Sequence, residues 1–368
     1  MFKRIAAIQV LANGAFLASF TYISIFADEL GLSRFHITIV ASLYSLAGFS
    51  SVYLFGKLAD QYGKRKVLRI GLALASGLVL FQAVSWNMPS LAILRLLSGI
   101  GFGMFPAPLA AYAFEAKARM GRFSAFGALG WGISLLASGW VADTFGVASV
   151  FVLSSILLLL SFLLSGSLGP IPEVKIRSPL LPIRMVMKNR EVLIPLIMRH
   201  ATASSIWILW PLFLNERLDL NLAQIGMVQA TNAFTQFIVM FTIGDRLKPK
   251  VSIGIGLFVT MLAVFSFTII DTFPLFLMTQ ILLGISWGTL FVGTLRYMLT
   301  KNPERATAAG LHNSSVQFSS LLAPFISMTI VAMIPSSSYE GPMYLTVVFS
   351  ALALVLFLGG IISKKRSS

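Results

Sequence analysis

Long apolar segments recur along the whole chain and are separated by short polar or charged breaks. Each apolar segment has about 20 residues, which is the length that a helix needs to cross the hydrocarbon core of a bilayer. We number the predicted spans one to twelve in chain order. They lie near residues 5–27, 37–56, 67–86, 90–113, 122–142, 147–166, 191–214, 222–243, 251–270, 274–298, 305–333 and 343–362.

The composition excludes an ordinary soluble protein. Of the 368 residues, 57% are hydrophobic and 11% are charged, and the mean hydropathy is +0.86. Soluble domains carry about 25% charged residues. Twelve spans leave about ten residues for each loop or tail, which is too few for a folded soluble domain. We therefore expect an all-α polytopic membrane protein with twelve transmembrane helices.

The basic residues are distributed unevenly between the two sides of this layout. Arg34 and Arg217 fall on one side and Arg95 and Arg199 lie well inside spans, which leaves 24 of the 28 Lys and Arg residues in the tails, alternate loops and adjoining span ends of the other side. Because positively charged loops stay in the cytoplasm, we expect both termini to be cytoplasmic and the chain to lie in the cytoplasmic (inner) cell membrane.

The net charge of +15 follows from this topology and from attraction to anionic membrane lipids. The sequence contains no basic patch interleaved with aromatic residues, so nothing in it suggests nucleic acid as a partner.

The longest loop, residues 167–190, contains four prolines among basic residues, as is typical of a linker between domains. It separates a predicted N-terminal six-helix bundle, residues 1–166, from a predicted C-terminal bundle, residues 191–368.

The two halves are related by an internal repeat. Asp60 maps onto Asp245, and the segment Gly-Ile-Gly-Phe-Gly at 99–103 maps onto Gly-Ile-Ser-Trp-Gly at 284–288, both at an offset of 185. Both halves begin in the cytoplasm, so they are predicted to be parallel repeats. In such proteins the substrate binds near the midplane between the repeats and is carried by alternating access.

Sequence patterns for catalysis and metal binding are absent. The chain has no Cys and only three scattered His residues, which excludes disulfides, a thiolate metal site and a histidine cluster. It also lacks a phosphate-binding Gly-x-x-x-x-Gly-Lys-Ser/Thr loop and any nucleophile paired with a base. We expect neither an enzyme nor a bound cofactor.

Two motifs carry a family resemblance. The segment between spans two and three reads Gly56-Lys57-Leu58-Ala59-Asp60-Gln61-Tyr62-Gly63-Lys64-Arg65-Lys66, and span four contains Arg95-Leu96-Leu97-Ser98-Gly99-Ile100-Gly101. The first resembles the cytoplasmic loop signature of the major facilitator superfamily, and the second is similar to its Arg-x-x-x-Gly-x-Gly motif. The similarity in span pattern covers the whole chain.

The resemblance implies the major facilitator fold and a transporter of small organic solutes that works as a monomer. Among the branches of the superfamily, the chain most resembles the twelve-span drug efflux transporters, which implies protons as the coupling ion. Many of these exporters have a Gly-Pro motif in span five. Here the glycines of span five are not followed by Pro.

Asp60 lies where span two leaves the membrane, on the same side as the start of span eleven. The free amides and positive dipole end of span eleven are therefore expected to face its carboxylate. Gly56 and Gly63 would permit close backbone approach. By resemblance, Asp60 with Lys64 and Arg65 helps to hold a cytoplasmic gate. The alternative is a solvated loop carboxylate.

Arg95 and Arg199 lie inside predicted spans, where a charge costs roughly 2.5 to 3.5 kcal/mol. No Asp or Glu lies deep in any span, so carbonyls, polar side chains, water or substrate must hold these arginines. By resemblance Arg95 takes part in proton coupling, and Arg199 is expected to line the cavity. His200 can carry protons. The alternatives are snorkelling for Arg95 and packing against a neighbouring helix for Arg199 and His200.

Other polar and aromatic residues at helical spacing mark expected cavity faces. These candidates are Asn13, Trp131, Trp207, Trp210, Asn232, Gln236, Trp287, Asn313 and Gln317. Polar stripes also join helices through hydrogen bonds, and Trp side chains also fill helix bundles, so both interpretations stay open.

We therefore expect a secondary active transporter that moves a small organic solute across the membrane, with proton-coupled efflux of drug-like compounds as the main hypothesis. The first alternative is a transporter of organic anions or metabolites, because no buried carboxylate opposes Arg95 and Arg199. The second is a non-transporting membrane sensor built on the same scaffold.

Overall fold

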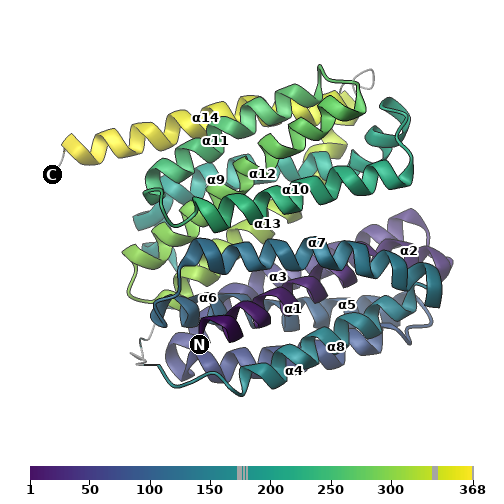
Figure 1. Cartoon of the computed structure of the whole chain (residues 1–368), viewed down its shortest axis with the longest axis horizontal. Coiled ribbons are helices and arrows are strands. Elements are labelled where there is room, and N and C mark those ends of the chain that lie inside the picture. Colours follow the sequence, from purple (N-terminus) through teal and green to yellow (C-terminus); the bar gives the residue numbers. More distant parts are fainter. Residues whose placement is uncertain (172–175, 177–178, 180, 334–338, 367–368) are drawn as a thin grey trace. The chain divides into compact units, whose positions relative to one another are not determined.

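A computed structural model describes residues 1–368 except 172–175, 177–178, 180, 334–338 and 367–368 (Figure 1). The described secondary structure is helical. The elements are α1 (Phe2–Thr21), α2 (Ile23–Glu29), α3 (Arg34–Tyr62), α4 (Lys64–Gln82), α5 (Met88–Gly103), α6 (Pro106–Glu115), α7 (Met120–Phe145), α8 (Ala148–Ser165), α9 (Ile183–Leu212), the π-helical turn η1 (Phe213–Arg217), α10 (Leu222–Thr242), α11 (Pro249–Phe267), α12 (Phe273–Lys301), α13 (Arg305–Met333) and α14 (Glu340–Arg366).

Each predicted span coincides with one helix or with two consecutive elements. Span one is divided at Tyr22 into α1 and α2, and span four is divided at residues 104–105 into α5 and α6. The second break has a local cause, because Pro106 has no N–H to donate to the preceding turn. Helix α9 begins at Ile183, eight residues before the predicted start of span seven. The Lys and Arg residues in these eight positions lower the hydropathy, so the segment does not read as part of an apolar span. Both residue types nevertheless form helices readily.

Eight helical stretches in the described residues are long and apolar enough to cross a membrane. Helix α4 is not among them because Lys64, Arg65, Lys66 and Arg69 lower the apolar character of its first turns. The positions of these charges at one end of the helix still fit a span whose end lies at the membrane surface.

The chain forms two compact units. Unit 1 contains residues 1–182 and 299–314, and unit 2 contains residues 183–298 and 315–368. Residues at the start of α13 therefore belong to unit 1, where they pack against α3. The boundaries expected from the sequence at residues 166 and 190 stay a prediction.

Within unit 1, helix α1 packs on α7 and α8, and α5 packs on α3 and α4. Small residues allow the helix axes to approach. A Cβ on Gly130 of α7 would lie 2.3 Å from the carbonyl oxygen of Val10 in α1, and the hydroxyl of Ser134 donates to the carbonyl oxygen of Gly14 at 2.6 Å. Such close crossings are typical of helices packed in a membrane.

Within unit 2, helix α14 packs on α9 and α11. An aromatic cluster fills one end of the unit, where Trp210 packs against Phe213, Phe267 and Phe276 with ring centroids 5.1 to 5.8 Å apart.

The same helix crossings occur in both units, as the internal repeat predicts. Gly99 of α5 faces the carbonyl oxygen of Tyr44 in α3, and Gly284 of α12 faces that of Asn232 in α10. Tyr44 and Asn232 are 188 positions apart, and the two glycines are 185 apart. Each half therefore builds its second and fourth spans around an equivalent glycine contact.

Candidate functional site

The first cluster of candidate residues lies where α3 meets α4 and the start of α13, all in unit 1. The carboxylate of Asp60 is 2% exposed. It accepts hydrogen bonds from the backbone N–H of Ala306 at 3.2 Å, from the backbone N–H of Thr307 at 2.7 Å and from the Thr307 hydroxyl at 2.8 Å. The predicted approach of Asp60 to the start of span eleven is thus present in the structure.

Lys64 completes the charge balance of this cluster. Its ammonium lies 3.4 Å from the Asp60 carboxylate and 3.1 Å from the carboxylate of Glu115 at the end of α6. Lys64 is 1% exposed. A buried carboxylate is tolerated only when charges and hydrogen bonds compensate for its lost hydration. Here Lys64 and the positive end of the α13 dipole do so.

Two glycines bring α3 and α13 close enough for these contacts. A Cβ on Gly56 would lie 2.5 Å from the carbonyl oxygen of Ala306, and a Cβ on Gly310 would lie 2.8 Å from that of Val52. One turn further along α13, the hydroxyl of Ser314 donates to the Phe49 carbonyl oxygen at 2.6 Å. Side chains at the two glycine positions would push the helices apart.

Gly63 forms the whole connection between α3 and α4. Its φ of +104° lies in the region that L side chains rarely adopt, which explains the need for glycine. Because the connection is one residue long, Lys64 is the first residue of α4 and lies one turn from Asp60. The neighbouring Arg65 donates from its guanidinium to the carbonyl oxygen of Gly166 at 2.6 Å.

Arg95 forms the second cluster, in the interior of unit 1. Its side chain is fully buried. The guanidinium lies 4.2 Å from the ring centroid of Tyr44 and donates to the side-chain oxygen of Gln82 at 3.5 Å, and Gln82 in turn donates to Ser98. No carboxylate among the described residues pairs with Arg95. The arginine therefore remains in the helix bundle, held by an amide and an aromatic face, and does not snorkel.

Arg199 forms a third cluster, in unit 2. It is 3% exposed and donates to the hydroxyls of Thr260 at 2.9 Å and Ser286 at 3.1 Å. Its guanidinium lies 5.2 Å from the ring centroid of Trp287. His200 stacks on the same indole, with centroids 4.6 Å apart. The structure thus brings Arg199, His200 and Trp287 together beside two hydroxyl groups, and in the described residues no acidic side chain forms an ion pair with Arg199.

The other polar candidates mostly make contacts along their own helices. Asn13 donates to the carbonyl oxygen of Gln9, Gln236 donates to Asn232, and Asn313 donates to the carbonyl oxygen of Ala309. Gln317 is half-buried in α13.

The remaining tryptophans lie in different surroundings. Trp131 is half-buried in α7, and Trp207 is 40% exposed. Trp207 packs edge-on against Trp210 at 4.8 Å, and Trp210 belongs to the aromatic cluster of unit 2. A role in substrate binding for these residues stays a prediction.

Sequence reasoning missed the partners that hold the charged residues. These are Tyr44, Gln82, Glu115, Thr260, Ser286 and Thr307. Of these, only Glu115 could be suspected from the sequence, because it lies just after span four on the same side of the membrane as Lys64. Ser and Thr are frequent in membrane helices, where they also bond to their own backbone, so their positions alone do not identify a site.

Comparisons with known proteins give consistent results. A family model described as Major Facilitator Superfamily matches residues 5–198 and 192–367. The multidrug resistance protein MdtG of Salmonella paratyphi A is 25% identical over 314 residues, which cover 76% of this chain and 75% of MdtG. The multi-drug resistance efflux pump PmrA of Streptococcus pneumoniae is 31% identical over 159 residues, which cover 39% of this chain and 38% of PmrA.

Among solved structures, the human organic anion transporter MFSD10 (TETRAN) has a similar fold. The TM-score is 0.77 at 14% identity, and the match covers 97% of this chain and 98% of that protein. At this identity the likeness concerns the fold alone.

Proposed function

Because this chain belongs to the major facilitator superfamily, we propose that it is a proton-coupled secondary active transporter that exports a small organic solute by alternating access. It lies in the cytoplasmic membrane with both termini in the cytoplasm and works as a single chain. The names of its relatives MdtG and PmrA support efflux of drug-like compounds, and the distribution of basic residues supports the orientation.

The Asp60 contact carries this proposal. Alternating access requires a contact that is strong in one state of the protein and broken in another. Asp60 ties α3 to the start of α13 through three hydrogen bonds, and α13 then continues into unit 2. We assign to this contact the role of a cytoplasmic latch, made of Gly56, Asp60, Gly63, Lys64 and Arg65.

The test uses purified protein in liposomes with an inside-acid pH gradient. Uptake of the lipophilic cation ethidium with dissipation of the gradient is the expected result, because an exporter in inverted orientation exchanges protons for solute. Asp60→Asn should reduce the rate about tenfold or more, since hydrogen bonds to a charged acceptor contribute about 1.5 to 3 kcal/mol each. The matched control is Asp245→Asn, the same change at the repeat position. Ethidium uptake that leaves the pH gradient intact would refute proton exchange, and an unaffected Asp60→Asn variant would refute the latch.

A second candidate function is transport of organic anions. The observation that favours it is the Arg199 cluster, where a buried guanidinium lies beside two hydroxyls and the indole of Trp287 and forms no ion pair with a carboxylate of the described residues. Such a group of donors suits a carboxylate or phosphate ester. Arg95 adds a second buried positive charge in unit 1.

Carboxyfluorescein serves as the anionic probe in the same liposomes. Anion transport predicts uptake that is lost in Arg199→Gln and partly retained in Arg199→Lys, since Lys keeps the charge but not the planar set of donors. Equal uptake by the parent chain and Arg199→Gln would remove the support for this function. Binding of either probe without uptake would favour the sensor.

A further inference from the structure

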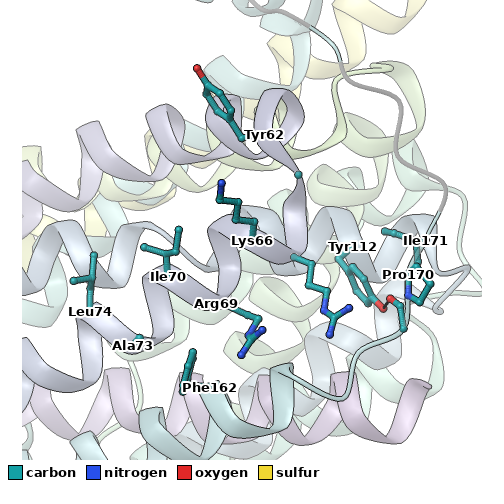
Figure 2. Close-up of a pocket in the computed structure, with 13 residues that line it drawn as sticks. Tyr62, Lys66, Arg69, Ile70, Ala73, Leu74, Tyr112, Phe162, Pro170 and Ile171 are labelled. Carbon is teal, nitrogen blue, oxygen red and sulfur yellow. Dashed lines mark hydrogen bonds between the residues drawn. The ribbon is translucent and has the colours of Figure 1, made fainter.

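An open groove of about 880 Å³ lies in unit 1, next to the Asp60 cluster, with which it shares Gly63 and Arg65. It is lined by the end of α3, the first three turns of α4, Tyr112 of α6, Phe162 of α8 and residues 169–171 (Figure 2). The groove combines two chemically different surfaces, one cationic and one apolar.

The first surface is cationic. Arg65, Lys66 and Arg69 line the groove within five consecutive positions of α4. Lys66 is exposed, and both arginines are half-buried. In the described part of the chain none of the three forms an ion pair, whereas their neighbour Lys64 is paired with two carboxylates.

The two arginines also retain unused donors. Arg65 donates to the Gly166 carbonyl oxygen, and the Arg69 guanidinium lies 5.2 Å from the ring centroid of Phe162. The Nε atoms of both are buried and have no hydrogen-bond partner among the described residues. A buried donor without a partner costs free energy, so an acceptor in the groove would stabilise this arrangement.

The helix itself adds to the positive potential. Helix α4 begins at Lys64, and its first turn contains no acidic residue and no side-chain cap. The positive dipole end of α4 therefore lies beside the three cations, and its potential adds to their attraction for an anion.

The second surface is apolar and continues along the same helix. Figure 2 shows Lys66, Ile70 and Leu74 along one side of α4, with Arg69 directed toward Phe162. Ile70 and Leu74 are 44% and 49% exposed. Leu74 follows Lys66 by eight residues, which is about 12 Å along a helix. A free inorganic anion would use only the cationic end of the groove.

We propose that this groove binds an anionic phospholipid. The phosphodiester lies at Arg65, Lys66 and Arg69, and an acyl chain follows Ile70 and Leu74 toward the middle of the membrane. Basic pockets at the ends of membrane helices recognise anionic headgroups in this way. The site shares Gly63 and Arg65 with the proposed latch, but Lys66, Arg69, Ile70 and Leu74 lie outside the latch, and the proposal stands on different observations.

The test measures lipid binding to the purified, delipidated full-length protein by native mass spectrometry. Phosphatidylglycerol and phosphatidylcholine with identical acyl chains are compared. We expect one phosphatidylglycerol to bind tightly and in preference to phosphatidylcholine. In the Lys66→Gln/Arg69→Gln variant this affinity should fall about 30-fold, which corresponds to the loss of two cation contacts with an anionic lipid.

The matched control is Lys248→Gln/Lys250→Gln, which removes two charges from the equivalent end of α11 in the second repeat. It should keep the tight site. The conservative variant Lys66→Arg/Arg69→Lys should keep it too. Equal losses in both Gln variants would overturn the proposal in favour of general charge attraction, and so would a Lys66→Gln/Arg69→Gln variant that binds like the parent chain.

Soluble probes separate the lipid from its headgroup. Inorganic phosphate and glycerophosphoglycerol carry the same acceptor oxygens without acyl chains, and neither should displace the bound phosphatidylglycerol. Displacement by either one at millimolar concentration would show an anion site that makes no use of the apolar surface, and would overturn the assignment to a lipid.

Discussion

At the scale of single residues, Asp60 shows how a charged group is kept inside a membrane protein. Three hydrogen bonds and Lys64 compensate for its lost hydration, and all of them come from helix ends. Arg95 and Arg199 are held differently, by polar and aromatic groups without a counter-charge in the described residues. A role for their positive charge in substrate binding or proton coupling stays a prediction.

Lys64 is expected to be the most sensitive cation of the loop signature. Lys64→Gln would leave the buried carboxylate of Asp60 and the half-buried carboxylate of Glu115 without their shared counter-charge, and breaking a buried pair such as Lys64–Asp60 costs about 3 to 5 kcal/mol. The thermal unfolding midpoint in detergent should fall clearly. Lys57→Gln, which removes a half-buried cation that forms no ion pair in the described residues, is the control. Equal midpoints for the two variants would contradict the assigned role of Lys64.

Gly56 tests the close approach of α3 to α13. In Gly56→Ala the new Cβ would lie 2.5 Å from the carbonyl oxygen of Ala306, and because that atom belongs to the backbone the helices must separate. Overpacking of this kind costs about 1 to 3 kcal/mol, so the unfolding midpoint and the transport rate should both fall. At Gly77, where a Cβ would meet no atom within 4 Å, the Ala variant should be as stable as the parent chain or slightly more stable. A Gly56→Ala variant that behaves like Gly77→Ala would show that the helices do not need this contact.

At the scale of helices, most of the structure could be predicted from the sequence because each span is a separate apolar segment. The breaks were harder to foresee. Pro106 explains the division between α5 and α6, but no Pro or Gly stands next to Tyr22 from which the break there could be predicted. The partners of Arg95 and Arg199 could not be predicted either. Gln82, Thr260 and Ser286 lie 13 to 87 positions away in the chain, and only helix packing brings them close.

The repeated helix crossing leads to a prediction for both halves. Gly99→Ala and Gly284→Ala should each lower the unfolding midpoint, because a Cβ would lie 2.6 Å from the Tyr44 carbonyl oxygen in one case and 2.6 Å from Thr235 Cβ in the other. Gly226→Ala, in an exposed position of α10 with no atom within 4 Å of the new Cβ, is the control. If only one of the two repeat variants differs from Gly226→Ala, the crossings are not equivalent in energy.

At the scale of the whole molecule, the orientation in the membrane rests on the distribution of basic residues and can be tested directly. The chain contains no Cys, so a single introduced Cys is the only thiol that a reagent can label. Lys248→Cys lies at the start of α11 and Asp271→Cys lies between α11 and α12. In intact cells a membrane-impermeant maleimide should label Asp271→Cys and leave Lys248→Cys unlabelled until the membrane is opened. The reverse pattern would place both termini outside.

The contacts of Asp60 also have a consequence for selectivity, if they form the latch that we propose. A ligand can shift an equilibrium between two states only by the difference between its affinities for them. Three hydrogen bonds and one ion pair therefore set a threshold that each solute must exceed before it is carried, and compounds below the threshold bind without crossing. Changes that weaken this contact should widen the range of accepted solutes and lower the stability of the protein. The range of substrates and the stability of the fold should therefore change in opposite directions when Asp60 is altered.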